Sequence, residues 1–354
     1  MVTTVENQTE PVRSGVAPFS ARERWVLVVA SAWLVIGLQL DAYAHATTPE
    51  LETFWTPWHG VLYSGIAASG FTLLWIMRSR LPGIPTYRSV LALPNALRLP
   101  LAGMAFLLVG GGVDTLWHNI WGIERDMEIF VSPSHEFIIL GMVLVAMGPA
   151  LMLATGPERT LGAGGALLVG ISTLFTVLPV HIYSLHATAI GFRHLGSDLD
   201  PIPVFSPDAQ LIHGYIFSTI LLLVPFIVIG RRWPLPIGLP SVLVSLVAVF
   251  MHLMFDSQRA WWPALTLAAA AIALEVVLRV AIPFVRLSAN ARWILFGLLT
   301  PPAAWGAVLL VGKIQTGTTG FNIHVVTGLL TMTALTGAGT VLVARSVQHL
   351  PKPE

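Results

Sequence analysis

Hydrophobic residues dominate ten long segments of the chain, and short polar or charged stretches separate these segments. Each segment is close to the roughly 20 mostly apolar residues that an α-helix needs to cross a bilayer. Helices suit this environment because all of their backbone hydrogen bonds are made within the segment. The predicted spans lie near residues 24–43, 58–77, 98–118, 134–154, 162–184, 210–230, 237–255, 261–282, 292–312 and 322–344.

The composition indicates the class of protein to which this pattern belongs. Of the 354 residues, 55% are hydrophobic and 10% are charged, and the mean hydropathy is +0.76. Soluble domains carry about 25% charged residues. We therefore predict an all-α, polytopic transmembrane bundle over residues 21–345, in contact with the lipid bilayer of the cell membrane. The tail 1–20 lacks periodicity and is expected to be disordered, and residues 346–354 form a second short tail.

The basic residues predict how the bundle is oriented. Of the 19 Lys and Arg residues, all but Arg125, Arg193, Arg259 and Lys313 fall on one set of loops and tails. The positive-inside rule places these loops, and both termini with them, in the cytoplasm. Every histidine except His349 then falls in outer loops or in the outer parts of helices. We therefore expect the chemistry of the protein near the outer face of the membrane.

Two of the predicted helical hairpins carry the same polar motif. In each copy, an Asp and a His four residues later end one apolar segment, and a second His opens the next segment after a Thr/Ser-Pro pair. Residues four apart share a helix face, so each copy can direct one carboxylate and two imidazoles at one point. The candidate metal ligands are Asp41, His45 and His59 in the first copy and Asp114, His118 and His135 in the second.

A structural interpretation of the same motif is that the Asp caps a helix end and the His pairs with it. The repetition of order and spacing favours metal binding in at least one copy. Thr56 and Ser132 are expected to cap the helices that His59 and His135 open, with a Pro in the first turn.

The two copies are expected to be unequal, with the second one carrying the function. Glu136 adjoins His135 and offers a further oxygen ligand, and charged residues fill the loop at 119–133. From that loop, Glu124 or Asp126 is expected to form a solvated rim or to orient a His ring. The glycines at 110–112 precede Asp114 and predict close helix packing.

Other histidines extend the pattern in a weaker form. The hairpin at 162–230 has histidines at similar places, so together with the hairpins near 24–77 and 98–154 it predicts a degenerate internal repeat. The additional candidates for metal ligands, or for residues that orient the ligands, are Glu136, His186, His213, His252 and Asp256.

The ligand types restrict the metal. The chain has no cysteine, which excludes Cys-zinc sites and iron–sulfur clusters. Imidazole with carboxylate suits copper, zinc or iron. A haem held by two histidines is less favoured, because the Asp four residues before the first His would have no role in it.

The repeated motif resembles the copper-binding motif in the C subunit of the copper membrane monooxygenases, which oxidise methane, ammonia and short alkanes. The resemblance rests on Asp-x3-His followed by Thr/Ser-Pro-x-His, and it implies copper ligands at the six residues given above. The chain departs from the family pattern in having two copies and longer loops, and the resemblance does not extend to the spans after residue 154.

Three classes of function are compatible with these features. The leading expectation is a copper-dependent oxidoreductase or monooxygenase, or a subunit of one, that acts on a small apolar substrate at the outer face. The second is a membrane protein that transports copper or zinc or hands it to a partner. The third is a structural subunit of a membrane complex or homo-oligomer. Neither the sequence composition nor its motifs point to a nucleic-acid partner or identify a catalytic residue.

Overall fold

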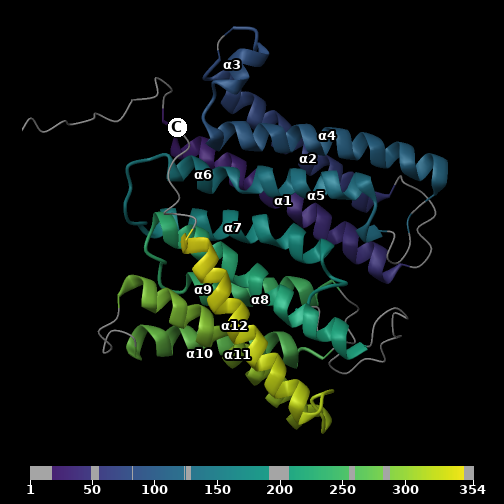
Figure 1. Cartoon of the computed structure of the whole chain (residues 1–354). Coiled ribbons are helices and arrows are strands. Elements are labelled where there is room, and N and C mark those ends of the chain that lie inside the picture. The colour runs from purple at the N-terminus through teal and green to yellow at the C-terminus, as the bar shows by residue number, and fades with distance from the viewer. Residues whose placement is uncertain are drawn as a thin grey trace, which may run out of the picture.

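The chain folds into a bundle of α-helices, as shown by a computed structural model (Figure 1) that describes residues 18–48, 56–81, 83–122, 124, 129–190, 207–254, 260–281 and 288–346. No strand occurs in these ranges. The helices are α1 (Ala21–Thr47), α2 (Pro57–Arg78), α3 (Tyr87–Leu91), α4 (Asn95–Trp121), α5 (Pro133–Ala146), α6 (Gly148–Ala154), α7 (Ala163–Tyr183), α8 (Pro207–Arg232), α9 (Leu239–His252), α10 (Trp262–Ala281), α11 (Ala289–Thr316) and α12 (Ile323–Ser346). The predicted all-α transmembrane bundle is confirmed.

Nine helical segments among the described residues are long and apolar enough to cross a membrane. They correspond to nine of the ten predicted spans. The exception is the span expected at 237–255, where α9 has only 14 residues. The helix begins at Leu239, directly after Gly238 with its positive φ of 82°, and it ends at His252, before the expected end at 255.

One predicted span is interrupted. The segment expected at 134–154 forms α5 and α6, which are separated at Met147. Pro149 cannot donate a backbone hydrogen bond, so the helical ladder is broken there. Ser172 on α7 compensates: its hydroxyl donates to the carbonyl of Ala146 at 2.6 Å and lies 3.4 Å from the amide nitrogen of Ala150.

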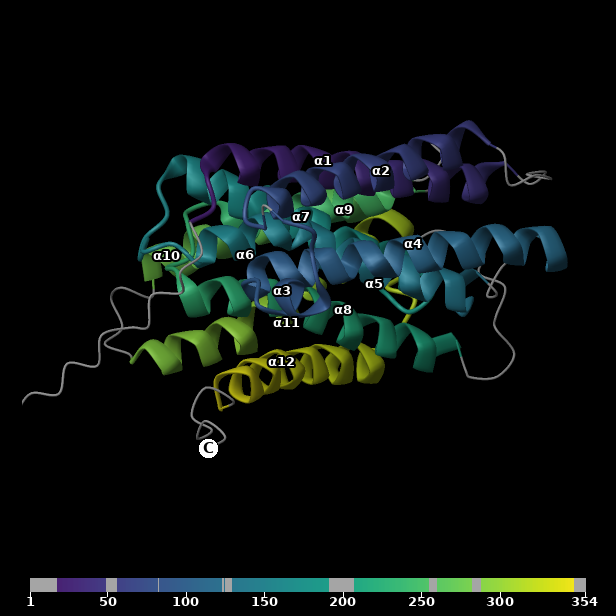
Figure 2. The same ribbon diagram turned by 90° about the horizontal axis from the view of Figure 1, so that it is seen from above.

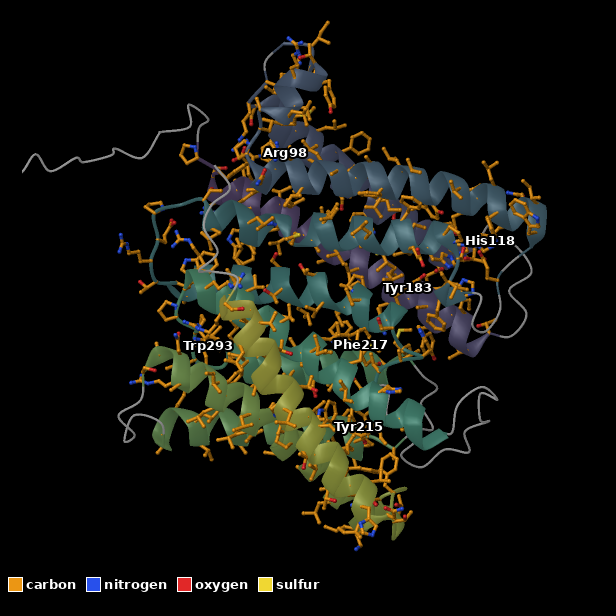
Figure 3. All side chains as sticks on the ribbon, in the orientation of Figure 1. Arg98, His118, Tyr183, Tyr215, Phe217 and Trp293 are labelled. Carbon is orange, nitrogen blue, oxygen red and sulfur yellow. The ribbon has the colours of Figure 1, made fainter. Side chains whose placement is uncertain are left out.

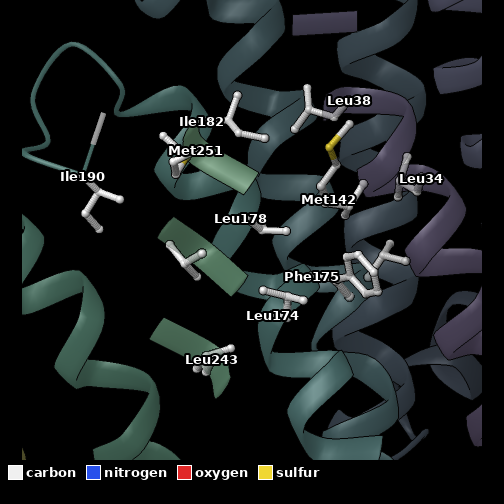
Figure 4. Close-up of a cluster of buried hydrophobic side chains, with 14 of the residues drawn as sticks. Leu34, Leu38, Met142, Leu174, Phe175, Leu178, Ile182, Ile190, Leu243 and Met251 are labelled. Atoms are coloured by element: carbon white, nitrogen blue, oxygen red, sulfur yellow. The ribbon is translucent and has the colours of Figure 1, made fainter. Parts of the chain in front are cut away.

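The helices pack in two groups on either side of α7. In Figure 1, α2 and α4–α6 lie above α7, α1 runs diagonally past it, and α8–α12 lie below it; Figure 2 shows the same bundle from above. Buried side chains from α1, α5, α7 and α9 meet around α7, among them Leu34, Met142, Leu178 and Met251 (Figure 4). Many apolar side chains on the outer helix faces are exposed, including Phe71 and Ile314. These faces contact lipid in a bilayer.

The two ends of the bundle differ in chemistry. Arg22, Arg24, Arg78 and Arg98 lie at one end of α1, α2 and α4, and at this end Glu23 forms a buried 2.6 Å ion pair with Arg80. The Asp and His residues of the motifs lie at the opposite ends of the same helices. This polarity fits the predicted topology, while the side of the membrane on which each end lies stays a prediction.

Candidate metal centre

Both copies of the motif lie at the same end of the bundle. The last turns of α1 and α4 carry the Asp-x3-His pairs, and the first turns of α2 and α5 carry the second histidines. His118 lies at the end of the bundle opposite to Arg98 and Trp293 (Figure 3). The structure therefore gives a helical membrane protein with a group of His, Asp and Glu side chains concentrated at one end.

The first set consists of Asp41, His45 and His59. The Nε2 of His59 lies 3.3 Å from Oδ1 of Asp41, and the Nε2 of His45 lies 3.8 Å from Oδ2 of the same carboxylate. The predicted cap is present, because Thr56 Oγ1 accepts a hydrogen bond of 3.2 Å from the backbone N–H of His59. This bond stabilises the first turn of α2, which carries His59.

The second set consists of Asp114, His118, Glu124 and His135. Oδ1 of Asp114 lies 3.3 Å from Nε2 of His118 and 3.2 Å from Nε2 of His135. The other ring nitrogen of His135, Nδ1, lies 2.9 Å from the carbonyl oxygen of Ile129. In a neutral ring this contact makes Nδ1 the donor and leaves Nε2 as the ligand atom.

Glu124 belongs to the second set, although the sequence motif does not include it. Its Oε2 lies 3.4 Å from Nε2 of His118, and its Oε1 accepts a 2.8 Å hydrogen bond from the hydroxyl of Ser132. Ser132 occupies the N-cap position of α5, yet its side chain does not cap the helix. The expectation of a second Ser cap is therefore wrong: this hydroxyl holds Glu124 instead. The only sequence signal was an acidic residue in the connecting loop.

Each set has the composition and spacing of a metal site. In the described part of the chain, one possible ligand atom from every member of a set lies within 4.8 Å of those of the other members. Asp41, His59, Asp114, His118 and Glu124 are buried. Oδ1 of Asp41 and Oε2 of Glu124 are buried oxygens that accept no hydrogen bond from described residues. A bound cation would satisfy these oxygens, so both sets fit a metal ion.

The two sets are neighbours. The ring centroids of His59, in the first set, and His118, in the second, are 6.2 Å apart. The rings within each set are separated by similar distances, 5.6 Å for His45 and His59 and 6.2 Å for His118 and His135. The two motifs are far apart in the sequence, and the packing of α2 against α4 brings them together.

The additional candidates lie apart from these sets. Glu136 has an exposed side chain, although it follows His135 directly. His186 is also exposed, with its ring against Phe130. His213 is exposed on α8. His252 is buried, and its ring packs against Trp261 with 3.9 Å between centroids. Asp256, its predicted partner, lies outside the described residues.

A cavity of about 500 Å³ lies between α8, α9, α10 and α11, and none of the candidate ligands lines it. Its walls include Phe226, Trp293 and Trp305, with Glu275 and Arg279 among the polar lining residues. Since Trp293 and His118 lie at opposite ends of the bundle (Figure 3), this cavity is separate from the candidate metal centre.

Comparison with known proteins adds no further assignment. The chain matches no family model, no curated protein and no solved structure.

Proposed function

We propose that this protein is a metal-dependent membrane oxidoreductase, or a subunit of one, that uses copper at the two ligand sets to oxidise a small apolar substrate. The observation that carries the proposal is the concentration of four histidines and three carboxylates at one end of a membrane bundle. Ionisable groups in a membrane are costly and are retained where they have a function. Oδ1 of Asp41 and Oε2 of Glu124, which accept no hydrogen bond from the described residues, support a cation as their partner.

Copper is favoured over zinc and iron by two arguments. Imidazole is a good ligand for copper, and four of the seven candidate ligands are histidines. The motif also resembles the copper site in the C subunit of the copper membrane monooxygenases. When bound, copper would supply one-electron chemistry with dioxygen.

The side chains of this protein have distinct roles in the proposal. His45, His59, His118 and His135 would hold the metal through ring nitrogens, and the carboxylates would compensate its charge. Ser132 and Thr56 keep ligand-bearing segments in place through the hydrogen bonds described above. In the proposal, a small apolar substrate reaches the sets from the surrounding lipid, because the sets lie at the end of apolar helices.

Transport of metal ions is the second candidate, and the distribution of acidic groups disfavours it. A conduit needs polar groups through the full membrane depth. At the basic end, Glu23 pairs with Arg80, and Glu275 accepts from the backbone of Gly238 and Ser241 and from Arg279. These acids are engaged in local contacts that stabilise the fold. They therefore do not extend the group of possible metal ligands towards the basic end of the bundle.

Metal analysis of the purified chain in lipid nanodiscs tests the proposal. After copper loading and removal of free metal, the wild type is expected to retain up to two copper ions per chain. His118→Ala combined with His135→Ala should remove at least half, because these rings are half of the histidine ligands. His213→Ala is the matched control, since this histidine is exposed and outside both sets. Folded wild-type protein that binds no copper would overturn the proposal.

The reaction class needs a second measurement. Membranes containing the copper-loaded chain, supplied with oxygen and a reductant, should oxidise a short alkane if the chain works alone. Vesicles containing the chain should not accumulate copper. Copper uptake without substrate oxidation would identify a transporter instead.

A further inference from the structure

Tyr63 lies between the two ligand sets. It follows His59 by one turn on α2, and the two rings meet edge to face with 6.4 Å between centroids. Its hydroxyl reaches across to α4, where it donates to Oδ2 of Asp114 at 3.2 Å. A residue on the helix of the first set thus holds a carboxylate of the second set.

The two oxygens of Asp114 have separate partners. Oδ2 faces Tyr63, whereas Oδ1 faces the histidines and also accepts a 3.1 Å hydrogen bond from Ser134. The hydrogen bond from Tyr63 therefore fixes the carboxylate plane while leaving Oδ1 directed at the centre of the second set. Partners of this kind set ligand orientation and typically change metal affinity by about 10- to 100-fold.

Gly111, three residues before Asp114, leaves space for the Tyr63 ring against α4. A Cβ at Gly111 would lie 3.0 Å from Cε1 of Tyr63, whereas a Cβ at the neighbouring Gly112 would meet nothing within 4 Å. The Tyr63 hydroxyl also lies 3.4 Å from the Gly111 carbonyl oxygen. The middle glycine thus provides the space in which the tyrosine ring lies against α4.

We propose that Tyr63 is a positioning residue that couples the two ligand sets into one centre for two cations. This inference rests on the proposed metal binding. A metal on His59 would restrain the first turn of α2 further, and with it Tyr63 one turn later. The hydrogen bond from Tyr63 to Asp114, which is present in the structure, would then hold the carboxylate more rigidly, so filling the first set would raise the affinity of the second. By reciprocity, filling the second set raises the affinity of the first by the same factor.

Copper titration of the full chain in nanodiscs, followed by equilibrium binding and by electron paramagnetic resonance of Cu(II), tests the coupling. Tyr63→Phe removes the hydroxyl and keeps the ring. It should still bind two copper ions, but with second-set affinity reduced about 10- to 100-fold and with an altered spectrum. Gly111→Ala displaces the ring without removing the hydroxyl and should act in the same direction. Tyr43→Phe, an exposed tyrosine on α1, is the control.

The same titration in an Asp41→Ala, His45→Ala background isolates the coupling. With the first set disabled, Tyr63→Phe loses only the direct hold of the hydroxyl on Asp114, so it should change second-set affinity less than it does in the wild type, where the coupling is lost as well. A Tyr63→Phe protein whose two binding constants and spectrum match the wild type would overturn the coupling alone. A wild type that binds no copper would overturn the proposed function and the coupling together, so the two failures are distinguishable.

Discussion

At the scale of single residues, the acid that contacts a ligand histidine in space is not the acid that lies next to one in the sequence. Glu136 adjoins His135 in the chain, but on a helix the next residue points about 100° away, and its side chain is exposed. Glu124 is six residues after His118, beyond the end of α4, yet its carboxylate lies 3.4 Å from the His118 ring. The hydroxyl of Ser132 secures it there. Glu124 is therefore the better candidate for the additional oxygen ligand.

Replacing each acid by its amide separates these two candidates. Glu124→Gln should weaken copper binding at the second set by about 10- to 100-fold, because the amide loses the charge that opposes the cation. Glu136→Gln should leave the copper dissociation constant within error of the wild type. Copper competition titrations on both purified variants measure this. A larger effect of Glu136→Gln would instead identify Glu136 as the oxygen ligand, as its position next to His135 in the sequence predicts.

At the scale of elements, the metal centre depends on how closely the helices of each hairpin approach. A Cβ at Gly103 on α4 would lie 2.7 Å from the carbonyl oxygen of Gly141 on α5, and the reverse contact has the same length. The backbones are therefore in direct contact at this crossing. Such close packing stabilises helix pairs in membranes through van der Waals contacts. It also sets the distance between α4, which carries Asp114, and α5, which carries His135.

Gly103→Ala should force these two helices apart. We expect a loss of about 1–3 kcal/mol in stability from overpacking and weaker copper binding at the second set. Gly112→Ala is the matched control, because its Cβ would meet nothing within 4 Å, and it should gain up to about 1 kcal/mol from helix propensity. Thermal melting and copper titration of both variants measure these effects. A Gly103→Ala protein at least as stable as the control would contradict the role of this crossing.

At the scale of the whole molecule, the two ends of the bundle are chemically distinct. One end holds arginines and the Glu23–Arg80 ion pair, and the other holds both ligand sets. The positive-inside rule predicts that the arginine-rich end faces the cytoplasm. The centre would then lie near the outer face, where it can take up substrate and metal without access to the cytoplasm.

Single cysteines test this orientation, since the chain contains none of its own. Thr48→Cys follows α1 at the histidine end, and Ile84→Cys lies in the connection before α3 at the other end; both positions are exposed. An impermeant maleimide added to intact cells should label the first variant only, and permeabilised cells should label both. The cysteine-free wild type controls for background. The reverse pattern of labelling would invert the topology.

The sequence determined the features that depend on local spacing. A long apolar segment predicts a membrane helix, because a helix makes all of its backbone hydrogen bonds within the segment. This signal located nine long spans. It also predicted a full span at 237–255, where α9 has only 14 residues, and it missed the break at Pro149. The Asp and His pairs were recognised because residues four apart share one face of any helix. The degenerate repeat and the identity of the metal stay predictions.

Which polar groups come into contact depends on how the helices pack. No periodicity relates Tyr63 to Asp114, because their contact depends on how α2 packs against α4 at Gly111. The same packing brings His59 next to His118, which turns two motifs separated by a helical hairpin into neighbours. Glu124 follows the end of a helix, where no regular spacing fixes direction, so its place was set by the hydrogen bond from Ser132. Contacts between separate elements depend on side-chain shape and helix crossing, which hydrophobic patterning along one chain does not encode.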